Sequence, residues 1–328
     1  MMDLELLHFR AALLNHIRSF FLGRSYLELD TPSLSPCLIP ETCLEVFKTE
    51  YYEPWSGEKR DLFLVPSPEV YIKQVIASHK VSVFQISKCY RNVESVGHTH
   101  SPEFTMLEYY TMNADYHDSL HLTEELFKSF SKLEYDIPQF IKPPFTCLTM
   151  SEAFNTYAGF YLDDCKTASA LAEKALSLSI HEPVDSPFQS WAWDDLYELI
   201  FVHAVEPSLP KNRMTFLTDY PSLVPCLAQN ADSFHKERWE LYGGGIEIAN
   251  CYSEETDPEK VRAYFLQEGK LKMEQSRVQH GIDNTYWENF RDFPKCSGTA
   301  MGFDRLLMLL TKRSVIDSVL PFPLKQQP

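Results

Sequence analysis

Three glutamates and an asparagine between residues 240 and 254 have the spacing of a site for a hard cation. Glu240 and Glu247 stand on either side of a triple glycine, and Asn250 and Glu254 follow. Carboxylates seven residues apart on neighbouring strands can converge on one cation that prefers oxygen ligands, such as Mg²⁺. In an acidic chain, such glutamates can also be ordinary surface residues. On a regular strand Glu247 alternates away from Asn250 and Glu254, so all three reach one site only if a β-bulge intervenes.

A further glutamate, Glu108, stands where a core residue is expected. Phe104, Met106, Glu108 and Tyr110 alternate along one run, which places their side chains on the same face of a strand. An unpaired carboxylate buried there would cost on the order of several kcal/mol, so it must be paired, hydrogen-bonded or neutralised. Taken alone, the residue favours a structural ion pair or an exposed strand edge over a binding role.

Two arginines supply the complementary charge. Arg91 ends the strand that precedes Glu108, and Arg305 lies near the start of a predicted helix, where the helix dipole and a planar guanidinium both favour phosphate oxygens. Each alone is more often a surface residue. Together with a loop long enough to close over a nucleotide, they indicate a nucleoside triphosphate held against antiparallel strands. The sequence contains neither a P-loop nor a Rossmann glycine pattern.

The elements that must position these residues begin with an amphipathic helix. Residues 4–22 have helical apolar spacing and are followed by Gly23, and residues 26–32 read as a short strand ended by Pro32. Residues 62–69 form a strand that leads into a helix reaching Ser78, with Ser67 as N-cap and Pro68 as first helical residue. Residues 81–91 and 103–112 predict an antiparallel hairpin with an unusually long loop.

The second half of the chain is less regular. We expect a helix at 117–132, proline-rich loops at 137–144 and 183–187, a helix at 258–280, and small residues from Cys296 leading into a helix that reaches Leu310. Residues 238–254 predict two strands joined through Gly243–Gly245, or one bulged strand. Residues 145–210 contain no recognisable motif. Without repeats or an evident linker, the sequence predicts one α+β domain, residues 1–328, with helices flanking an antiparallel sheet.

Composition narrows the class of protein. The 328 residues are 44% hydrophobic, which is enough for a large core, and the net charge of −16 disfavours extensive binding of nucleic acid. Eight scattered cysteines lack zinc-binding spacings, which is typical of reduced residues in the cytosol. The N-terminus lacks the pattern of a signal peptide, and no apolar run approaches about eighteen residues. We therefore expect a cytoplasmic protein without a membrane span.

Taken together, these residues resemble the catalytic core of class II aminoacyl-tRNA synthetases, and most of all the lysyl branch. The similarity extends from about residue 9 to 323. Pro32 with its preceding helix resembles the first motif of that class, which lies at a dimer interface and implies a homodimer. Arg91 and Asn92, with the run Pro-Glu-Phe-Thr-Met-Leu-Glu-Tyr-Tyr at 102–110, resemble the second motif, and Gly298 to Arg305 resembles the third.

Two features point to one branch of this family. The chain begins directly at the core, without the N-terminal OB-fold that reads the anticodon, and it is acidic. Ala300 stands where the synthetases have glycine, and one methyl group can reshape a closed amino-acid pocket. Both features resemble the elongation factor P (R)-β-lysine ligases, which activate β-lysine with ATP and transfer it to a lysine side chain of elongation factor P.

The resemblance implies ATP and Mg²⁺ as cofactors and assigns roles residue by residue. Arg91 would contact the α-phosphate and Arg305 the γ-phosphate as the catalytic residues, and Phe104 would stack on adenine. The other ATP-binding residues would be Asn92, Val93, Glu94, Ser101, Glu247, Ile248, Asn250 and Gly302, with Mg²⁺ held by Glu240 and Glu247. The amino acid would be bound by Ser67, Pro68, Glu69, Glu108, Tyr110, Tyr252, Glu254 and Ala300, with Glu108 and Glu254 facing its side-chain ammonium.

The nucleotide loop departs from the family pattern. Ser101 stands where relatives have asparagine, and the family's Arg-Asn-Glu is here Arg-Asn-Val-Glu, in a loop one residue longer. Either Glu94 takes the role of the glutamate that contacts adenine, or that contact is lost.

The implied reaction needs no protein nucleophile or general base, because positioning and charge neutralisation promote attack of the substrate carboxylate on ATP. A shortened lysyl-tRNA synthetase paralogue that makes lysyl-adenylate for another acceptor is an alternative. A catalytically silent regulatory subunit is a second alternative, which Val93 favours. The retained arginines and carboxylates oppose it.

Overall fold

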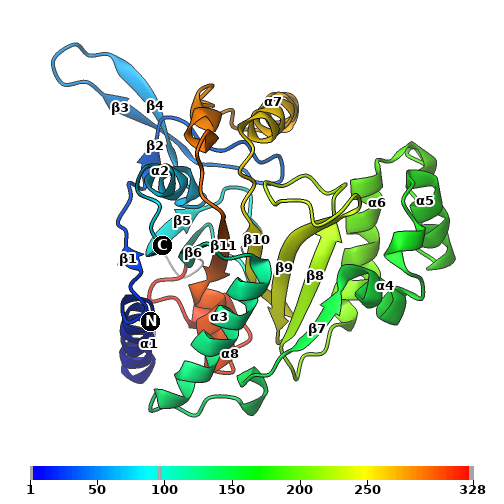
Figure 1. Ribbon diagram of the computed structural model, residues 1–328, viewed down its shortest axis with the longest axis horizontal. Helices are drawn as coiled ribbons and strands as arrows, with labels where there is room; N and C mark the ends of the chain where they lie inside the picture. Colours follow the sequence, from blue (N-terminus) through cyan, green and yellow to red (C-terminus); the bar gives the residue numbers. More distant parts are fainter. Residues whose placement is uncertain (1–2, 95, 97, 325–328) are drawn as a thin grey trace.

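The computed structural model describes residues 3–94, 96 and 98–324, and its largest element is an eight-stranded sheet (Figure 1). In spatial order the sheet contains β1 (Leu27–Glu28), β5 (Val83–Tyr90), β6 (Glu103–Met112), β11 (Cys296–Gly302), β10 (Ile246–Ser253), β9 (His235–Gly243), β8 (Thr215–Pro221) and β7 (Thr146–Thr149). All neighbouring pairs are antiparallel except β1–β5 and β7–β8 at the two edges. The prediction of an α+β fold is confirmed, while the parallel edges were not predicted.

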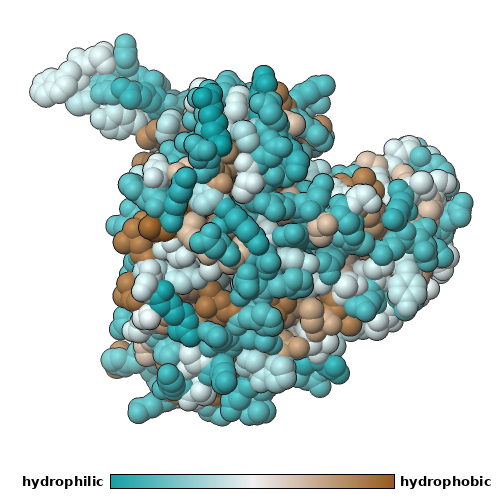
Figure 2. Space-filling model, viewed as in Figure 1, coloured by the Kyte–Doolittle hydropathy of each residue, from teal (hydrophilic) through white to brown (hydrophobic). Residues whose placement is uncertain are grey.

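A smaller sheet contains β2 (Leu34–Ser35), β4 (Lys59–Leu64) and β3 (Lys48–Tyr52). Its β3–β4 hairpin projects away from the rest of the molecule (Figure 1). Figure 2 shows mainly hydrophilic and neutral residues along this projection, as a solvated hairpin requires.

Eight α-helices surround the main sheet within the described residues: α1 (Leu4–Leu22), α2 (Glu69–His79), α3 (Tyr116–Ser129), α4 (Met150–Ala158), α5 (Ala168–Ser177), α6 (Trp193–Ile200), α7 (Pro258–Gln275) and α8 (Phe303–Leu310). Single turns of 3₁₀ helix lie at Phe130–Lys132, Gln139–Ile141, Leu162–Asp164, Phe188–Ser190, Glu206–Ser208, Tyr286–Phe290 and Ile316–Ser318, and a π turn at Phe201–Val205. Helix α2 begins one residue later than expected, but the Ser67 hydroxyl still accepts a hydrogen bond of 3.0 Å from the Glu69 amide.

The two faces of β6 have different surroundings. Leu107 and Tyr109 lie in the main hydrophobic core with residues of α1, α3 and α8, and the ring of Phe21 packs 4.8 Å from that of Tyr109. The alternate residues of β6, among them Met106 and Glu108, line cavities on the other side of the sheet. The shared face predicted from their alternation is therefore confirmed.

The segment 145–210 forms a second hydrophobic cluster with part of the sheet. Helices α4, α5 and α6 lie beyond the β7–β8 edge (Figure 1), where Phe154 stacks on Tyr197 and both pack with Leu217 of β8. Helix α4 has a capping box between Thr149 and Glu152, a local signal that the sequence interpretation missed.

Three expected elements differ in the structure. The strand expected at 26–32 contains only Leu27–Glu28, the helix expected to reach His280 ends at Gln275, and Cys296–Gly302 is a strand. Small residues in β11 allow close packing: a Cβ at Gly298 would collide with a Glu254 carboxylate oxygen and the Tyr110 ring. Gly244 and Gly245 adopt positive φ values of 65° and 85°, so the triple glycine forms a turn between β9 and β10.

All eight cysteines are free. None of the helices within the described ranges combines the length and the apolar composition needed to cross a membrane.

Candidate active site

The register of the central strands brings distant residues into one row. Glu108 of β6 is opposite Ala300 of β11, Ala300 is opposite Asn250 of β10, and Asn250 is opposite Glu240 of β9. Residues opposite one another in a sheet project to the same face. The strand pairing therefore collects three polar candidates and the candidate alanine on the cavity side.

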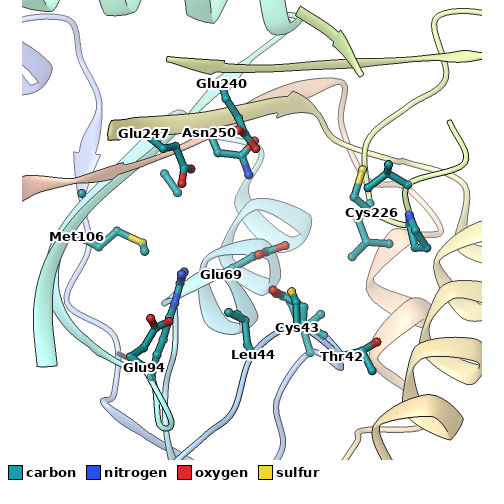
Figure 3. Close-up of a pocket in the computed structure, with 18 of the residues that line it drawn as sticks. Thr42, Cys43, Leu44, Glu69, Glu94, Met106, Cys226, Glu240, Glu247 and Asn250 are labelled. Carbon is teal, nitrogen blue, oxygen red and sulfur yellow. The ribbon is translucent and has the colours of Figure 1, made fainter. Parts of the chain in front are cut away.

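A β-bulge explains how Glu247 reaches the same face of the sheet as Asn250. Glu247 is opposite Tyr242 and Ala249 is opposite Leu241, so Ile248 is an extra residue in β10 between two registered pairs. The bulge turns Glu247 to the face that carries Asn250 and Glu240. Figure 3 shows the three side chains together on one side of the cavity. The bulge that the sequence required is confirmed.

A cavity of about 890 Å³ lies over this face. Its lining includes most of the candidate nucleotide residues: Arg91, Glu94, Ser101, Phe104, Glu240, Glu247, Ile248, Asn250, Gly302 and Arg305. The segment without a sequence motif also contributes, since Asp194 and Asp195 of α6 lie on the wall. The cavity is large enough for a nucleotide together with a second substrate.

A smaller cavity of about 90 Å³ shares walls with the first one. Its lining includes the candidates Ser67, Glu69, Glu108, Tyr110, Tyr252, Glu254 and Ala300. Of these, Glu69, Tyr252 and Ala300 also line the larger cavity. Three sequence candidates, Pro68, Asn92 and Val93, line neither cavity. Pro68 starts α2, and the Asn92 amide is engaged with the Val46 carbonyl.

Arg305 lies at the wall of the larger cavity, where several contacts fix its orientation. Its guanidinium donates hydrogen bonds to the Glu247 carbonyl at 2.9 Å and the Thr99 carbonyl at 3.2 Å, and its Nη2 lies 2.9 Å from the Nε2 of His100. An ion pair with the Glu247 carboxylate at 3.3 Å adds to these contacts. The guanidinium is therefore oriented before any ligand binds.

Arg91, unlike Arg305, has a hydrogen-bond donor that the described residues leave unused. Its guanidinium lies 5.2 Å from the centre of the Phe104 ring, and its Nε is buried without a hydrogen-bond partner within the described ranges. The ion pairs found among those residues do not include Arg91. A half-buried guanidinium with an unused, buried donor is suited to a phosphate or carboxylate oxygen.

Glu108 is a buried carboxylate that forms no ion pair with a cation among the described residues. The residue is 2% exposed, and its oxygens accept hydrogen bonds from the Ser67 hydroxyl at 2.5 Å and the Tyr110 hydroxyl at 3.3 Å. Burial, reinforced by the nearby Glu69 carboxylate, raises the pKa of Glu108 to about 8. Hydroxyl groups alone do not offset the cost of the charge, so a ligand ammonium would stabilise it.

Lys73 is a residue that the sequence interpretation missed. Its side chain is 1% exposed and its ammonium forms ion pairs with Glu69, one helical turn away, and with Glu254 at 2.7 Å. Burial lowers the pKa of Lys73, but the Glu254 and Glu69 carboxylates outweigh it and raise the pKa well above its ordinary value. Burial raises the pKa of Glu254 to about 7, against the opposing effect of Lys73. The i,i+4 spacing of Glu69 and Lys73 on a predicted helix was the available signal.

Glu240 and Glu247 form an acidic pair beside Arg305. Glu240 accepts hydrogen bonds from Arg238 at 2.6 Å and from the Tyr242 hydroxyl at 2.7 Å. Burial and then the Glu240 carboxylate raise the pKa of Glu247, while Arg305 opposes the rise. No group of three or more metal-ligating side chains occurs in the part of the chain that the structure describes. Two carboxylates suffice for Mg²⁺ when substrate phosphates complete its coordination, so the pair fits that ion.

The extra residue of the nucleotide loop points away from the cavity. Val93 has a φ of 59° and is 55% exposed, whereas Glu94 lines the larger cavity 3.9 Å from the Nε2 of His100. A β-branched residue rarely adopts positive φ, so this position is strained. The turn at Val93 absorbs the insertion and leaves Glu94 at the cavity wall.

Comparison with known proteins identifies the family of this chain. The family described as tRNA synthetases class II (D, K and N) matches residues 3–326. A curated relative from Klebsiella pneumoniae subsp. pneumoniae, named elongation factor P--(R)-beta-lysine ligase, is 32% identical over 317 residues, which cover 95% of this chain and 93% of the relative. The protein therefore belongs to the class II tRNA synthetase family of the D, K and N type.

Proposed function

We propose that this protein is an ATP-dependent ligase that activates a diamino acid, (R)-β-lysine or lysine, and transfers it to a lysine side chain of elongation factor P. The name of the Klebsiella relative supports this acceptor and substrate. The observation that carries the proposal is the buried carboxylate of Glu108, which has no cation partner in the part of the chain that the structure describes. It lies in a small cavity that shares Arg91 with a nucleotide-sized one. This arrangement suits an ammonium at one end and a phosphate at the other.

ATP would lie in the larger cavity. The unused donors of Arg91 would bind the α-phosphate, the oriented Arg305 would bind the γ-phosphate, and Phe104 would stack on adenine. Ser101, Ile248, Asn250 and Gly302 line the same cavity and would contact the nucleotide, and Glu94 would accept a hydrogen bond from the adenine amino group.

Mg²⁺ would be held by Glu240 and Glu247. When bound, the ion would neutralise charge on the phosphate oxygens. The hydrogen bonds that Glu240 accepts from Arg238 and Tyr242 would keep that carboxylate in position.

The first step is attack of the amino acid's carboxylate oxygen on the α-phosphorus. A bond forms between the carboxylate oxygen and the α-phosphorus. The bond from the α-phosphorus to the departing pyrophosphate breaks, and no proton moves. Arg91 would stabilise the charge that develops on the α-phosphate, while Ser67 and Tyr110 would hold Glu108 in position for the distal ammonium.

The second step joins the amino acid to the acceptor. The neutral ε-amine of the acceptor lysine attacks the activated carbonyl carbon, the bond to AMP breaks, and an amide bond forms as the nitrogen releases a proton to solvent. The larger cavity extends past the substrates to Asp194 and Asp195, an acidic wall that suits an approaching lysine side chain.

A homodimer belongs to the same proposal. The exposed leucines Leu4, Leu22 and Leu27 lie on α1 and β1, which precede Pro32 in the first motif, and would be covered by a second copy. Sedimentation of the purified protein tests this assembly.

Pyrophosphate exchange tests the activity directly. Wild-type protein with ATP should support exchange with (R)-β-lysine or L-lysine, with (S)-β-lysine as the stereochemical comparison. Absence of exchange with all three would refute the ligase. Mass spectrometry of elongation factor P after incubation with protein, ATP and the active amino acid should then show the added residue. An unshifted mass with active exchange would indicate another acceptor.

A further inference from the structure

Among the residues that the structure describes, two carboxylates around the small cavity, those of Glu108 and Glu41, form no ion pair with a cation. Glu69 and Glu254 share the ammonium of Lys73. Glu108 accepts hydrogen bonds only from hydroxyl groups, and Glu41 also lines this cavity. Lysine and β-lysine both carry two ammonium groups, so the second unpaired carboxylate, Glu41, has a chemical counterpart in the proposed substrate.

The backbone of Glu41 is held in place by α7. The ammonium of Lys272, which is buried, donates hydrogen bonds to the carbonyl oxygens of Glu41, at 2.9 Å, and of Leu44. Glu268 accepts a hydrogen bond from the Thr42 amide at 3.2 Å and another from the Thr42 hydroxyl. These contacts hold residues 41–44 rigidly, and such preorganisation reduces the entropy lost on binding.

The carboxylate of Glu41, in contrast, has no partner among the described residues. Within the described ranges, neither a hydrogen bond nor an ion pair involves its side chain, although its backbone carbonyl accepts hydrogen bonds from the Leu44 amide and from Lys272. Burial, then the Glu69 carboxylate, raises the pKa of Glu41 to about 7, while Arg91, Lys272 and Lys73 oppose the rise. A cation between Glu41 and Glu69 would stabilise both carboxylates.

The position of Glu41 indicates which ammonium it meets. Glu41, Glu69 and Arg91 line both cavities, whereas Glu108 lines only the smaller one. Figure 3 shows Thr42, Cys43 and Leu44 across the cavity from Glu240 and Glu247, with Glu69 between them. The substrate carboxylate must reach the α-phosphate near Arg91. The amino group closest to that carboxylate therefore lies at the junction of the cavities, and the distal ammonium lies at Glu108.

We propose that Glu41 is a specificity-determining residue that binds, together with Glu69, the amino group nearest the substrate carboxylate. The assignment rests on the proposed function, because it takes a diamino acid as the substrate. It explains how the site distinguishes diamino acids from amino acids that have only the distal ammonium.

The test compares substrates that differ only in this amino group. Pyrophosphate exchange is measured with the active diamino acid and with 6-aminohexanoate, which keeps the carboxylate and the distal ammonium. The variants are Glu41→Gln, the charge-preserving Glu41→Asp, and Glu58→Gln in the exposed β3–β4 hairpin as a control for net charge. Wild-type protein should prefer the diamino acid by about tenfold or more in kcat/KM, the usual scale for one buried ionic contact.

Glu41→Gln should lower this preference by about tenfold or more, because kcat/KM falls for the diamino acid and stays unchanged for 6-aminohexanoate. Glu41→Asp should keep part of the preference. Equal losses for both substrates would show a structural role and overturn the inference, as would an unchanged preference.

If wild-type protein supports no exchange at all, the proposed function fails instead. Calorimetric titration with lysine and 6-aminohexanoate then tests Glu41 separately. A wild-type preference for lysine that Glu41→Gln removes supports the inference. Equal binding of the two compounds to wild-type protein, or an unchanged preference in the variant, overturns it.

Discussion

The ammonium of Lys73 lies 2.7 Å from the carboxylate of Glu254, and each side chain is only 1% exposed. The protein thus supplies its own cation to one of the two carboxylates that sequence similarity assigns to the substrate ammonium. Glu108 has no such partner within residues 3–94, 96 and 98–324, and becomes the stronger candidate for that contact.

Replacing Lys73 with Met should destabilise the protein strongly. Glu69 and Glu254 would stay buried without a cation, which costs about 3 to 5 kcal/mol in the free energy of unfolding. Urea unfolding followed by circular dichroism measures this change. Lys48→Met removes an exposed ion pair with Asp61 and should leave the midpoint near that of wild type. Similar midpoints for the two variants would contradict the importance of the buried pair.

Glu108→Gln should impair use of the amino acid and spare ATP. Leaving a buried ammonium unpaired costs roughly 2 to 5 kcal/mol, so kcat/KM for the amino acid should fall by about tenfold to a few thousandfold. Exchange kinetics at varied amino acid and varied ATP separate the two effects. Glu103→Gln, an exposed position on the same strand, is the matched control. Equal losses for both substrates would argue against an ammonium contact.

Amino-acid affinity should rise with pH between about 6 and 8. Glu108 has a pKa of about 8 because of burial and the Glu69 carboxylate, so below that pH the free protein holds it mostly protonated. Binding of an ammonium favours the ionised carboxylate, and therefore releases a proton. Titration calorimetry in buffers of different ionisation enthalpy should detect this proton at pH 7. A pH-independent affinity, with no proton released, would exclude the coupling.

Glu94→Gln should weaken selection of adenine. The carboxylate would accept a hydrogen bond from the amino group of adenine, whereas guanine presents a carbonyl there and would be repelled by the negative charge. The ratio of kcat/KM for ATP to that for GTP should fall by about tenfold, the order expected when one charged hydrogen bond is lost. Exchange measured with each nucleotide gives this ratio. An unchanged ratio would mean that another group recognises the base.

Glu247→Gln should increase the Mg²⁺ concentration needed for half-maximal exchange by about tenfold or more, because one of two anionic ligands is lost. Titration of Mg²⁺ at fixed ATP measures the shift. Glu237→Gln changes a residue of β9 that alternates to the face opposite Glu240, so its Mg²⁺ curve should match that of wild type. Coinciding curves for Glu247→Gln and wild type would place the ion elsewhere.

The sequence by itself determined the features that depend on local periodicity. Alternation along 103–112 was enough to place Glu108 on the same face as Met106, and apolar spacing was enough to predict α1 and α3, because strand and helix periods depend on neighbouring residues. The family pattern around Arg91 and Arg305 singled out two residues that line the larger cavity, and their role with a nucleotide stays a prediction.

Tertiary structure decided the partners of these residues. Lys73 meets Glu254, and α7 positions Glu41, through contacts between segments far apart in the chain that no local pattern specifies. The sequence could state that Glu247 needed a bulge, but strand pairing with β9 determined where the extra residue, Ile248, would lie. The packing of segment 145–210 onto β8 also depends on contacts between distant parts of the chain, because its apolar side chains are buried against residues of the sheet.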